Sequence, residues 1–470
     1  MTNEHGQIIL KDSANIIERN TVKLSMVLKN ERDRKMDVYK VKPISVPPQL
    51  RVRVPGSKSI TNRALLLAAM TEGTTILRGV QFSEDSLHFL TALQDLGFHI
   101  SVDQQNCQAL VRGYGGRIPK TKATIYAGSA GTAARFLTAF VAMSPGWYRM
   151  NASEQMQKRP MQELFVALEE MGARFNWLGD PYAFPIEVQG MGSRYGEYRI
   201  QLNIDRSSQF LSALLMTAPL AMDSLVIELT GKRSARSYVQ MTEQMMRQFG
   251  HPGVLKYGED CYQVKKKPYQ AQDYLVEPDV SAACYFYAIA AVTGGTAIVQ
   301  NMVQDSLQGD MKFLEVLEEM GCTIQWVSGE NRSQELQLSG PKNGTLHGIT
   351  VNMSDFSDQA LTLAAIAPYA DSPVTIRGVT HIRRQESDRL KVMETELGRM
   401  GIRCELLEDG IVIYPGQPHA ARIQTYQDHR VAMAFAITGL RAEGIEIADP
   451  QCCRKTFADY FEVFEKGLYT

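Results

Sequence analysis

The chain has 470 residues, of which 44% are hydrophobic, and its 50 lysines and arginines are balanced by 51 aspartates and glutamates. This length and composition predict a folded protein with more than one buried core, in two or three domains. The balanced charge does not indicate a nucleic-acid or membrane partner, and the longest apolar stretch, near residues 282–292, is shorter than the ~20 residues of a membrane span.

The first 45 residues mix charged runs such as KNERDRK with short apolar pieces. We expect an N-terminal extension over residues 1–45, without the apolar segment of a secretory signal. The seven cysteines are scattered and show neither CxxC pairs nor zinc-ligand spacing. A reduced, cytoplasmic chain is the simplest interpretation of this cysteine usage.

After the extension, one pattern recurs: a small or glycine-rich turn, a β-branched strand, a polar loop, an amphipathic helix and a glycine that ends the helix. EGTTILRGVQFSEDSLHFLTALQDLG and GGTAIVQNMVQDSLQGDMKFLEVLEEMG are close copies. A glycine at this place supplies the left-handed residue after a helix. The expected helix-ending glycines, 66 to 80 residues apart, are Gly97, Gly172, Gly250, Gly321, Gly401 and Gly467. This spacing predicts six α/β units in two groups of three.

The two groups are expected to meet near residues 277–279, because KKKPYQAQDYLVEPDVSAA interrupts both helix and strand patterns. We expect the strand before residue 56 to belong to the other group, which would make a two-stranded hinge. The predicted domains are therefore residues 46–55 with 278–470, and residues 56–277.

Cationic side chains stand where apolar helices are predicted to begin. VPGSKSITNRALLLAAM places Lys58, Ser59 and Arg63 after a Pro-Gly turn, where backbone N–H groups and the helix dipole favour an anion. The spacing is not that of a P-loop. Other motifs of this kind, in chain order, are AGSAGTAARF, QKRPM, DRSSQFLSALL, RRQESDRLKVM, TYQDHRVAMAFA and RKTFADYF.

The helix dipole favours acids at a helix N-terminus, so repeated cations there need another explanation. They are Lys58, Arg63, Arg135, Arg159, Arg389, Arg430 and Lys455. We infer anionic substrates bound between two domains, each charged hydrogen bond contributing about 1.5–3 kcal/mol.

In this order, PGSKSxTNR, AGTAxR, SSQFLxALLMxAP, ESDR, DHRxAM and KTFxDYF closely resemble the motifs of the 5-enolpyruvylshikimate-3-phosphate synthases, which are enolpyruvyl transferases. The resemblance runs from about Val54 to Phe461. It implies a two-domain inside-out α/β barrel in which each domain is built from three βαβαββ repeats.

The resemblance also implies an activity. A member of this family transfers the enolpyruvyl (carboxyvinyl) group of phosphoenolpyruvate to the 5-hydroxyl of shikimate 3-phosphate and releases phosphate, in the shikimate pathway to chorismate and aromatic amino acids. It requires no metal or cofactor. We therefore expect a cytoplasmic monomer with small-molecule substrates as its only partners.

By resemblance, the residues on the shikimate 3-phosphate side are Lys58, Ser59, Arg63, Ser207, Ser208, Gln209, Tyr238, Asp358 and Gln385. Those on the phosphoenolpyruvate side are Lys58, Gly131, Arg159, Gln209, Arg389, Arg430 and Lys455. The catalytic residues would be Asp358 as the base for the hydroxyl, Glu386 as the carboxyl that handles the C3 proton, and Lys58.

The chain departs from the family pattern at four positions. Gln385 stands where a lysine is usual, Ala235 where a serine is usual with Ser234 one position away, Ser129 where an asparagine is usual, and Gln155 where an arginine is usual. Gln385 and Ala235 fall on the acceptor side. The sequence offers Arg236, Arg383 and Arg384 as replacements for the lost charge.

Two alternatives stay open. One is enolpyruvyl transfer to a different alcohol, although the absence of any cysteine between Cys107 and Cys261 disfavours the relative that acts on UDP-N-acetylglucosamine. The other is a non-catalytic homologue that binds phosphorylated ligands. Retention of both Asp358 and Glu386 argues against it.

Overall fold

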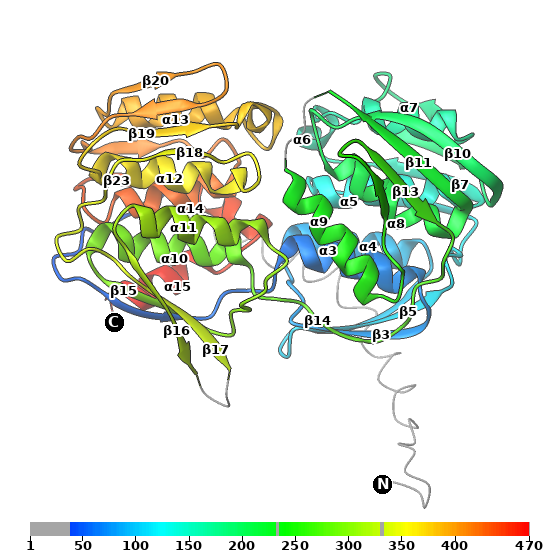
Figure 1. Ribbon diagram of the computed structural model, residues 1–470, viewed down its shortest axis with the longest axis horizontal. Helices are drawn as coiled ribbons and strands as arrows, with labels where there is room; N and C mark the ends of the chain where they lie inside the picture. The colour runs from blue at the N-terminus through cyan, green and yellow to red at the C-terminus, as the bar shows by residue number, and fades with distance from the viewer. Residues whose placement is uncertain (1–37, 232–234, 330–332, 470) are drawn as a thin grey trace, which may run out of the picture.

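The computed structural model describes residues 38–231, 235–329 and 333–469. Two hydrophobic cores form within it, one from residues 60–276 and one from residues 39–54 with 280–464. Figure 1 shows the two halves side by side, with the N-terminal half in blue to green and the C-terminal half in yellow-green to red, apart from the blue segment near residues 38–54 that packs on it. The cleft between these halves is where the motifs of the sequence meet.

Over the described residues, the strands of the N-terminal half form three four-stranded sheets. Their orders are β14(Asp273–Leu275)-β3(Glu72–Arg78)-β5(Gln108–Tyr114)-β4(His99–Asp103), β6(Lys122–Tyr126)-β7(Gly146–Asn151)-β9(Ile186–Gly190)-β8(Arg174–Trp177) and β10(Arg194–Asn203)-β11(Met222–Thr230)-β13(Cys261–Lys265)-β12(Leu255–Tyr257). In each sheet the first pair is parallel and the other pairs are antiparallel.

The described C-terminal half repeats this plan. Its sheets are β2(Gln49–Val52)-β15(Thr296–Val299)-β17(Gln334–Ser339)-β16(Thr323–Ser328), β18(Thr350–Asn352)-β19(Val374–Arg377)-β21(Ile411–Ile413)-β20(Cys404–Leu406) and β22(Ala421–Ile423)-β23(Ile445–Ala448)-β1(Val38–Lys40). The α/β class is confirmed, and five of the six units show the predicted βαβαββ order along the chain. The sixth, over residues 421–469, lacks the last two strands among the described residues, and β1 supplies the third strand of its sheet.

Helices lie in two shells. The inner ones are α3(Lys58–Met70), α5(Gly131–Met143) and α8(Gln209–Ala221) in one half, and α10(Val280–Thr293), α12(Ala360–Ile366) and α14(His429–Thr438) in the other. Nearly all of their residues are buried. The outer ones are α4(Glu84–Asp95), α7(Gln162–Glu170), α9(Arg236–Gln248), α11(Lys312–Glu319), α13(Arg389–Arg399) and α15(Tyr460–Tyr469), with the short α6(Glu154–Gln157) beside them. Five short 3₁₀ turns complete the described helices: η2(Gly309–Met311), η4(Ser357–Gln359), η5(Ala367–Tyr369), η6(Thr380–Arg384) and η7(Pro450–Lys455).

The halves exchange strands where the chain crosses between them. β2 precedes α3 in the chain but pairs in parallel with β15 of the other half, whereas β14 precedes α10 but pairs with β3. The two crossings also bind each other, because Ser57 N donates to Glu277 O and Asp279 N donates to Pro55 O, both at 2.8 Å. The two crossings therefore lie side by side, joined by backbone hydrogen bonds, at the place where the hinge was predicted.

Five of the six expected glycines stand just after their helices, with φ between 78° and 107°: Gly97, Gly172, Gly250, Gly321 and Gly401. At the first, Gly97 N donates to Gln94 O and Phe98 N to Leu93 O, which is the Schellman pattern. The sixth prediction is wrong, because Gly467 lies inside α15.

The expected N-terminal extension over residues 1–45 is wrong at its end. Val38–Lys40 form β1, which pairs with β23, and Val41 N and Ile44 N donate to Ile445 O and Leu440 O. Residues 1–37 lie outside the described residues. We propose that the C-terminal domain includes residues 38–55 with 278–470 and that residues 56–277 form the other domain.

The seven cysteines are free thiols. Among the described helices, none has the length and apolar character needed to cross a membrane.

Candidate active site

A cavity of about 850 Å³ lies where inner helices of both halves begin. It is lined at the N-terminus of α3 by Lys58 and Ser59, at that of α5 by Gly131, at that of α8 by Ser208 and Gln209, and at that of α14 by His429 and Arg430. η4, which leads into α12, adds Ser357 and Asp358. Because each helix directs its positive end at this space, the fold itself favours anions here.

Side-chain charge adds to the dipoles. In the described part of the chain the cavity is lined by seven cations, Lys58, Arg135, Arg159, Arg206, Arg384, Arg389 and Arg430, against the three carboxylates Asp85, Asp358 and Glu386. A phosphate carries about −1.5 to −2 at pH 7, and arginine matches its oxygens in a bidentate manner. The excess of cations therefore suits ligands that carry phosphate and carboxylate groups.

Asp358 is held by groups from three elements. Its Oδ1 lies 3.0 Å from Arg389 Nη1, and its Oδ2 lies 2.8 Å from Arg430 Nη2 and accepts from Tyr238 Oη at 2.7 Å. Burial alone would raise the pKa of Asp358, but Arg430 and Arg389 outweigh it and lower that pKa to about 2. Burial and the neighbouring Asp358 raise the pKa of Tyr238 well above its usual value, so Tyr238 is a neutral donor.

Glu386 lies at the contact between the halves. Its Oε1 is 3.4 Å from Arg159 Nη1 of the N-terminal half, and its Oε2 is 3.1 Å from Arg389 Nη2. Lys455 Nζ is 3.9 Å from Oε1 and donates to Ser129 Oγ at 2.9 Å. Burial opposes ionisation of Glu386, but these cations hold its pKa well below the usual range.

The N-terminal half contributes hydroxyls and a close pair of arginines. Ser207 Oγ accepts from Gln209 N at 3.3 Å, and Gln209 Oε1 accepts from Arg135 Nη1 at 2.8 Å. A side chain on Gly131 would place Cβ 2.7 Å from Arg135 Nη1 and 3.0 Å from Arg159 Nη1. Gly131 therefore leaves room for both guanidinium groups beside the cavity.

The structure brings together all the predicted site residues except two. Lys455 is not among the lining residues, although its ammonium reaches Ser129 and Glu386 at the edge of the site. Arg63 lies behind the wall: it is 1% exposed and donates to Thr242 Oγ1, Ser59 O and Tyr238 O. Because its donors are used on the protein, Arg63 supports Ser59 and Tyr238 rather than facing the cavity.

The four departures from the family pattern are all placed near the site. Gln385 lines the cavity and accepts from Arg389 Nη1, and Ala235 also lines it, with a left-handed φ of 56°. Gln155 Nε2 donates to Glu386 O at 3.1 Å across the cleft, while Ser129 binds Lys455. Ser234 lies outside the described residues.

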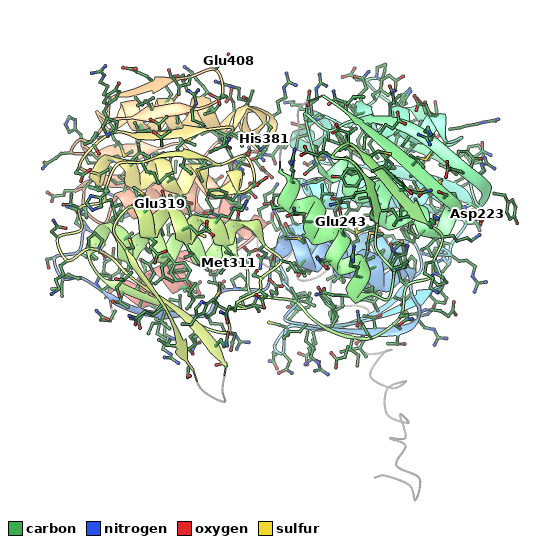
Figure 2. All side chains as sticks on the ribbon, viewed as in Figure 1. Asp223, Glu243, Met311, Glu319, His381 and Glu408 are labelled. Atoms are coloured by element: carbon green, nitrogen blue, oxygen red, sulfur yellow. The ribbon has the colours of Figure 1, made fainter. Side chains whose placement is uncertain are left out.

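Sequence reasoning missed some lining residues. Asp85, in the first turn of α4, is buried with Lys58 Nζ at 3.3 Å and Lys455 Nζ at 3.9 Å. His381 also lines the cavity and binds Ser357 Oγ through Nε2 at 2.8 Å, and burial lowers its pKa to about 4. Figure 2 shows His381 on the side of the C-terminal half that faces its partner half. Asp85 resembles an ordinary first-turn acid, so no sequence signal distinguished it.

The model of one family, EPSP synthase (3-phosphoshikimate 1-carboxyvinyltransferase), matches residues 45–464. The chain belongs to the EPSP synthase family. The match extends across both halves and both crossings, and so covers every residue of the cavity.

EPSP synthase relatives agree with this assignment. A protein of Nostoc punctiforme named 3-phosphoshikimate 1-carboxyvinyltransferase is 44% identical over 434 residues, which cover 92% of this chain and 100% of the relative. A chloroplastic one from Arabidopsis thaliana is 40% identical and covers 88% of this chain and 82% of its own. The solved EPSP synthase of Acinetobacter baumannii superimposes with a TM-score of 0.76 at 25% identity, covering 92% of this chain and 98% of the other. The inside-out barrel of the EPSP synthase family is thus the fold of this chain.

Proposed function

We propose that this protein is a 3-phosphoshikimate 1-carboxyvinyltransferase, which transfers the enolpyruvyl group of phosphoenolpyruvate to the 5-hydroxyl of shikimate 3-phosphate. The observation that carries the proposal is the cavity in which Asp358 and Glu386 lie among seven cations from both halves. Relatives that bear this name are similar over nearly the whole chain. The reaction belongs to the shikimate pathway to aromatic amino acids.

In the addition step, the 5-hydroxyl oxygen forms a bond to C2 of phosphoenolpyruvate while C3 gains a proton. Asp358 accepts the hydroxyl proton. In the free protein its carboxylate is a weak base, because Arg389 and Arg430 lower its pKa. When the carboxylate of phosphoenolpyruvate binds the same two arginines, they are shared between two anions, and Asp358 becomes more basic.

Glu386 handles the proton at C3. In the free protein it is ionised between Arg159, Arg389 and Lys455. The incoming phosphate competes for these cations, so the pKa of Glu386 rises and its carboxyl can carry a proton to C3. In the elimination step a C3 proton leaves and the bond from C2 to the phosphate oxygen breaks, which forms the enol ether and inorganic phosphate.

The cations stabilise the charge that is held on the phosphate as the adduct forms and breaks. They are fixed by buried contacts before the ligand arrives: Arg389 Nε, for example, lies 2.9 Å from the fully buried Asp428. Preorganised charge of this kind needs little rearrangement during the reaction.

We extend the proposal to a cytoplasmic monomer, as the cysteine usage and the resemblance predict.

The proposal is tested by incubating the purified protein with shikimate 3-phosphate and phosphoenolpyruvate and measuring phosphate release. Release that requires both substrates supports the transferase. Tight binding of either ligand without release would favour a non-catalytic homologue, and release only with another alcohol would favour a different enolpyruvyl transferase.

A matched pair of variants tests the role of Asp358 in the same assay. Asp358→Asn keeps the size of the side chain but removes the base, so we expect kcat to fall by about 10² to 10⁴. Asp355→Asn, which changes a partly exposed carboxylate paired with Lys312 at 2.9 Å, should leave kcat unchanged. Equal kcat values for Asp358→Asn and the unchanged protein would refute the assignment of the base.

A further inference from the structure

An outer hollow of about 1290 Å³ adjoins the cavity and is lined by residues of both halves. Five residues line both spaces and so mark the mouth of the site: Arg159, Arg206, Arg384, Gln385 and Glu386. Arg206 comes from the N-terminal half, immediately before Ser207, and Arg384 ends η6 of the C-terminal half. We propose that Arg206 and Arg384 together bind the phosphate group of the acceptor across this mouth and so set the preference for a phosphorylated alcohol. This inference rests on the proposed function.

The deeper cations are already committed to other groups. Arg389 contacts Asp358, Glu386 and Asp428, and Arg430 contacts Asp358. Lys58 lies 3.3 Å from Asp85, and Arg135 donates to Gln209 and to Pro160 O. These cations surround the two catalytic carboxylates at the floor of the cavity. We assign the cations of this floor to the binding of phosphoenolpyruvate.

The two arginines at the mouth are differently placed. Within the described residues, Arg384 is exposed and makes no ion pair or hydrogen bond. Arg206 is 41% exposed and has one carboxylate near it, Glu163 Oε1 at 3.3 Å from its Nε. Within the described residues, its terminal nitrogens make no hydrogen bond or ion pair. A second anion that enters the cavity therefore finds guanidinium donors available here, one from each half.

Groups around Arg206 complete an oxyanion site. Ser207 and Ser208 line the cavity beside it, at the N-terminus of the 13-residue helix α8. Two hydroxyls, the helix N-terminus and two planar guanidinium groups offer many donors to the three terminal oxygens of a phosphate monoester. A neutral hydroxyl in place of the phosphate would leave Arg384 without an anionic partner and Arg206 with Glu163 alone.

The structure also distinguishes Arg384 from the other arginines that the sequence left open. Arg383 lines only the outer hollow and pairs with Asp388 at 3.3 Å. Arg236 pairs with Glu259 at 3.3 Å and lines neither space. Gln385 lies at the mouth but is neutral, and its Oε1 accepts from Arg389.

The test compares Arg384→Gln and Arg206→Gln with Arg383→Gln as the matched control. Because a charged hydrogen bond is lost, we expect the KM for shikimate 3-phosphate to rise about tenfold or more in each of the first two variants. The KM for phosphoenolpyruvate and kcat should stay within about twofold. Arg383→Gln should behave as the unchanged protein does, and all three variants should keep its thermal midpoint because the side chains are exposed or half-buried.

Two further measurements, with a relocated charge and with an unphosphorylated acceptor, test the inference more strictly. Arg384→Gln combined with Gln385→Lys moves the cation by one residue along the same mouth. The double variant should reverse most of the rise in the KM for shikimate 3-phosphate. With unphosphorylated shikimate as the acceptor, Arg384→Gln should not change kcat/KM. A parallel rise in KM for both substrates, or equal behaviour of Arg384→Gln and Arg383→Gln, would overturn the inference.

Calorimetric titration with shikimate 3-phosphate alone separates this inference from the proposed function. If the protein binds this ligand without turnover, the transferase proposal fails, but weaker binding by Arg384→Gln would still support the phosphate site. If turnover occurs and the variants bind normally, only the phosphate site fails. Absence of both binding and turnover would contradict both.

Discussion

Asp310, in η2, is a buried carboxyl behind the floor of the active site. It is 5% exposed, binds Ser281 Oγ and accepts from Gln359 Nε2 at 3.2 Å. Ser281 Oγ in turn accepts from Arg430 Nη2 at 3.4 Å, which links Asp310 to the arginine that holds Asp358. Burial, and then the nearby Asp358, raise the pKa of Asp310 to about 6 from 3.8.

This shift makes stability depend on pH. The folded protein keeps the Asp310 proton up to about pH 6, whereas the unfolded chain keeps it only up to its ordinary pKa of 3.8. The stabilisation that this proton gives the folded protein is therefore complete below pH 3.8 and is lost as the pH rises through 6. Asp310→Asn stays neutral and avoids the loss. We expect the thermal midpoint of Asp310→Asn, relative to the unchanged protein, to be higher at about pH 7.5 than at about pH 5.

The control for this experiment is Asp355→Asn, whose difference from the unchanged protein should be the same at both pH values. A difference for Asp310→Asn that did not change between the two pH values would show that Asp310 titrates normally in the folded protein.

At the scale of single elements, α13 contains two glycines with opposite roles. Gly398 lies inside the helix, and a Cβ built there would meet nothing within 4 Å. Gly401 follows the helix with a φ of 78°, and a Cβ there would lie 2.8 Å from the His419 ring. The same substitution should therefore change stability in opposite directions at positions three residues apart.

Gly398→Ala should raise the free energy of unfolding by about 0.5–1 kcal/mol, because alanine loses less conformational entropy in a helix. Gly401→Ala should lower it by about 1–2 kcal/mol, because an L-residue is strained in the left-handed region. Denaturant titration of both variants measures the two changes. If both substitutions stabilised the protein, Gly401 would not be the residue that ends this helix.

At the scale of the whole molecule, the site exists only where the two halves meet. Lys455 of one half donates to Ser129 of the other, and Gln155 donates back to Glu386 O. The crossings are joined by the Ser57 and Asp279 backbone bonds. A ligand bound in the cleft should therefore order segments of both halves at once.

Hydrogen exchange with and without shikimate 3-phosphate tests this expectation. We expect added protection at residues 206–210 in the N-terminal half and at residues 381–386 in the C-terminal half, because each segment contributes several lining residues to the cavity. Strands β16 and β17, which line no part of it, should exchange at the same rate in both samples. Protection confined to one half would contradict a site shared between the halves.

The repeat could be predicted because it depends on patterns between residues that are close together in the sequence. Helical periodicity recurs in the outer helix of every unit, and a glycine with positive φ follows that helix in five of the six. The prediction for Gly467 was wrong because the sequence around it does not distinguish a glycine that ends a helix from one within a helix. The strand β1 was missed because its partner β23 lies about four hundred residues away, so only that distant pairing makes it a strand.

Local sequence patterns were enough to predict the family, the βαβαββ units and the polar motifs at helix starts, because each depends on residues close together in the chain. Which of those side chains reach one cavity depends on the tertiary fold. In the folded chain Arg63 lies behind the cavity wall and Asp85 lies beside Lys58. Arg384, and not Arg383, lines the cavity. Side-chain direction and the approach of segments hundreds of residues apart produce these differences, and no local pattern encodes them.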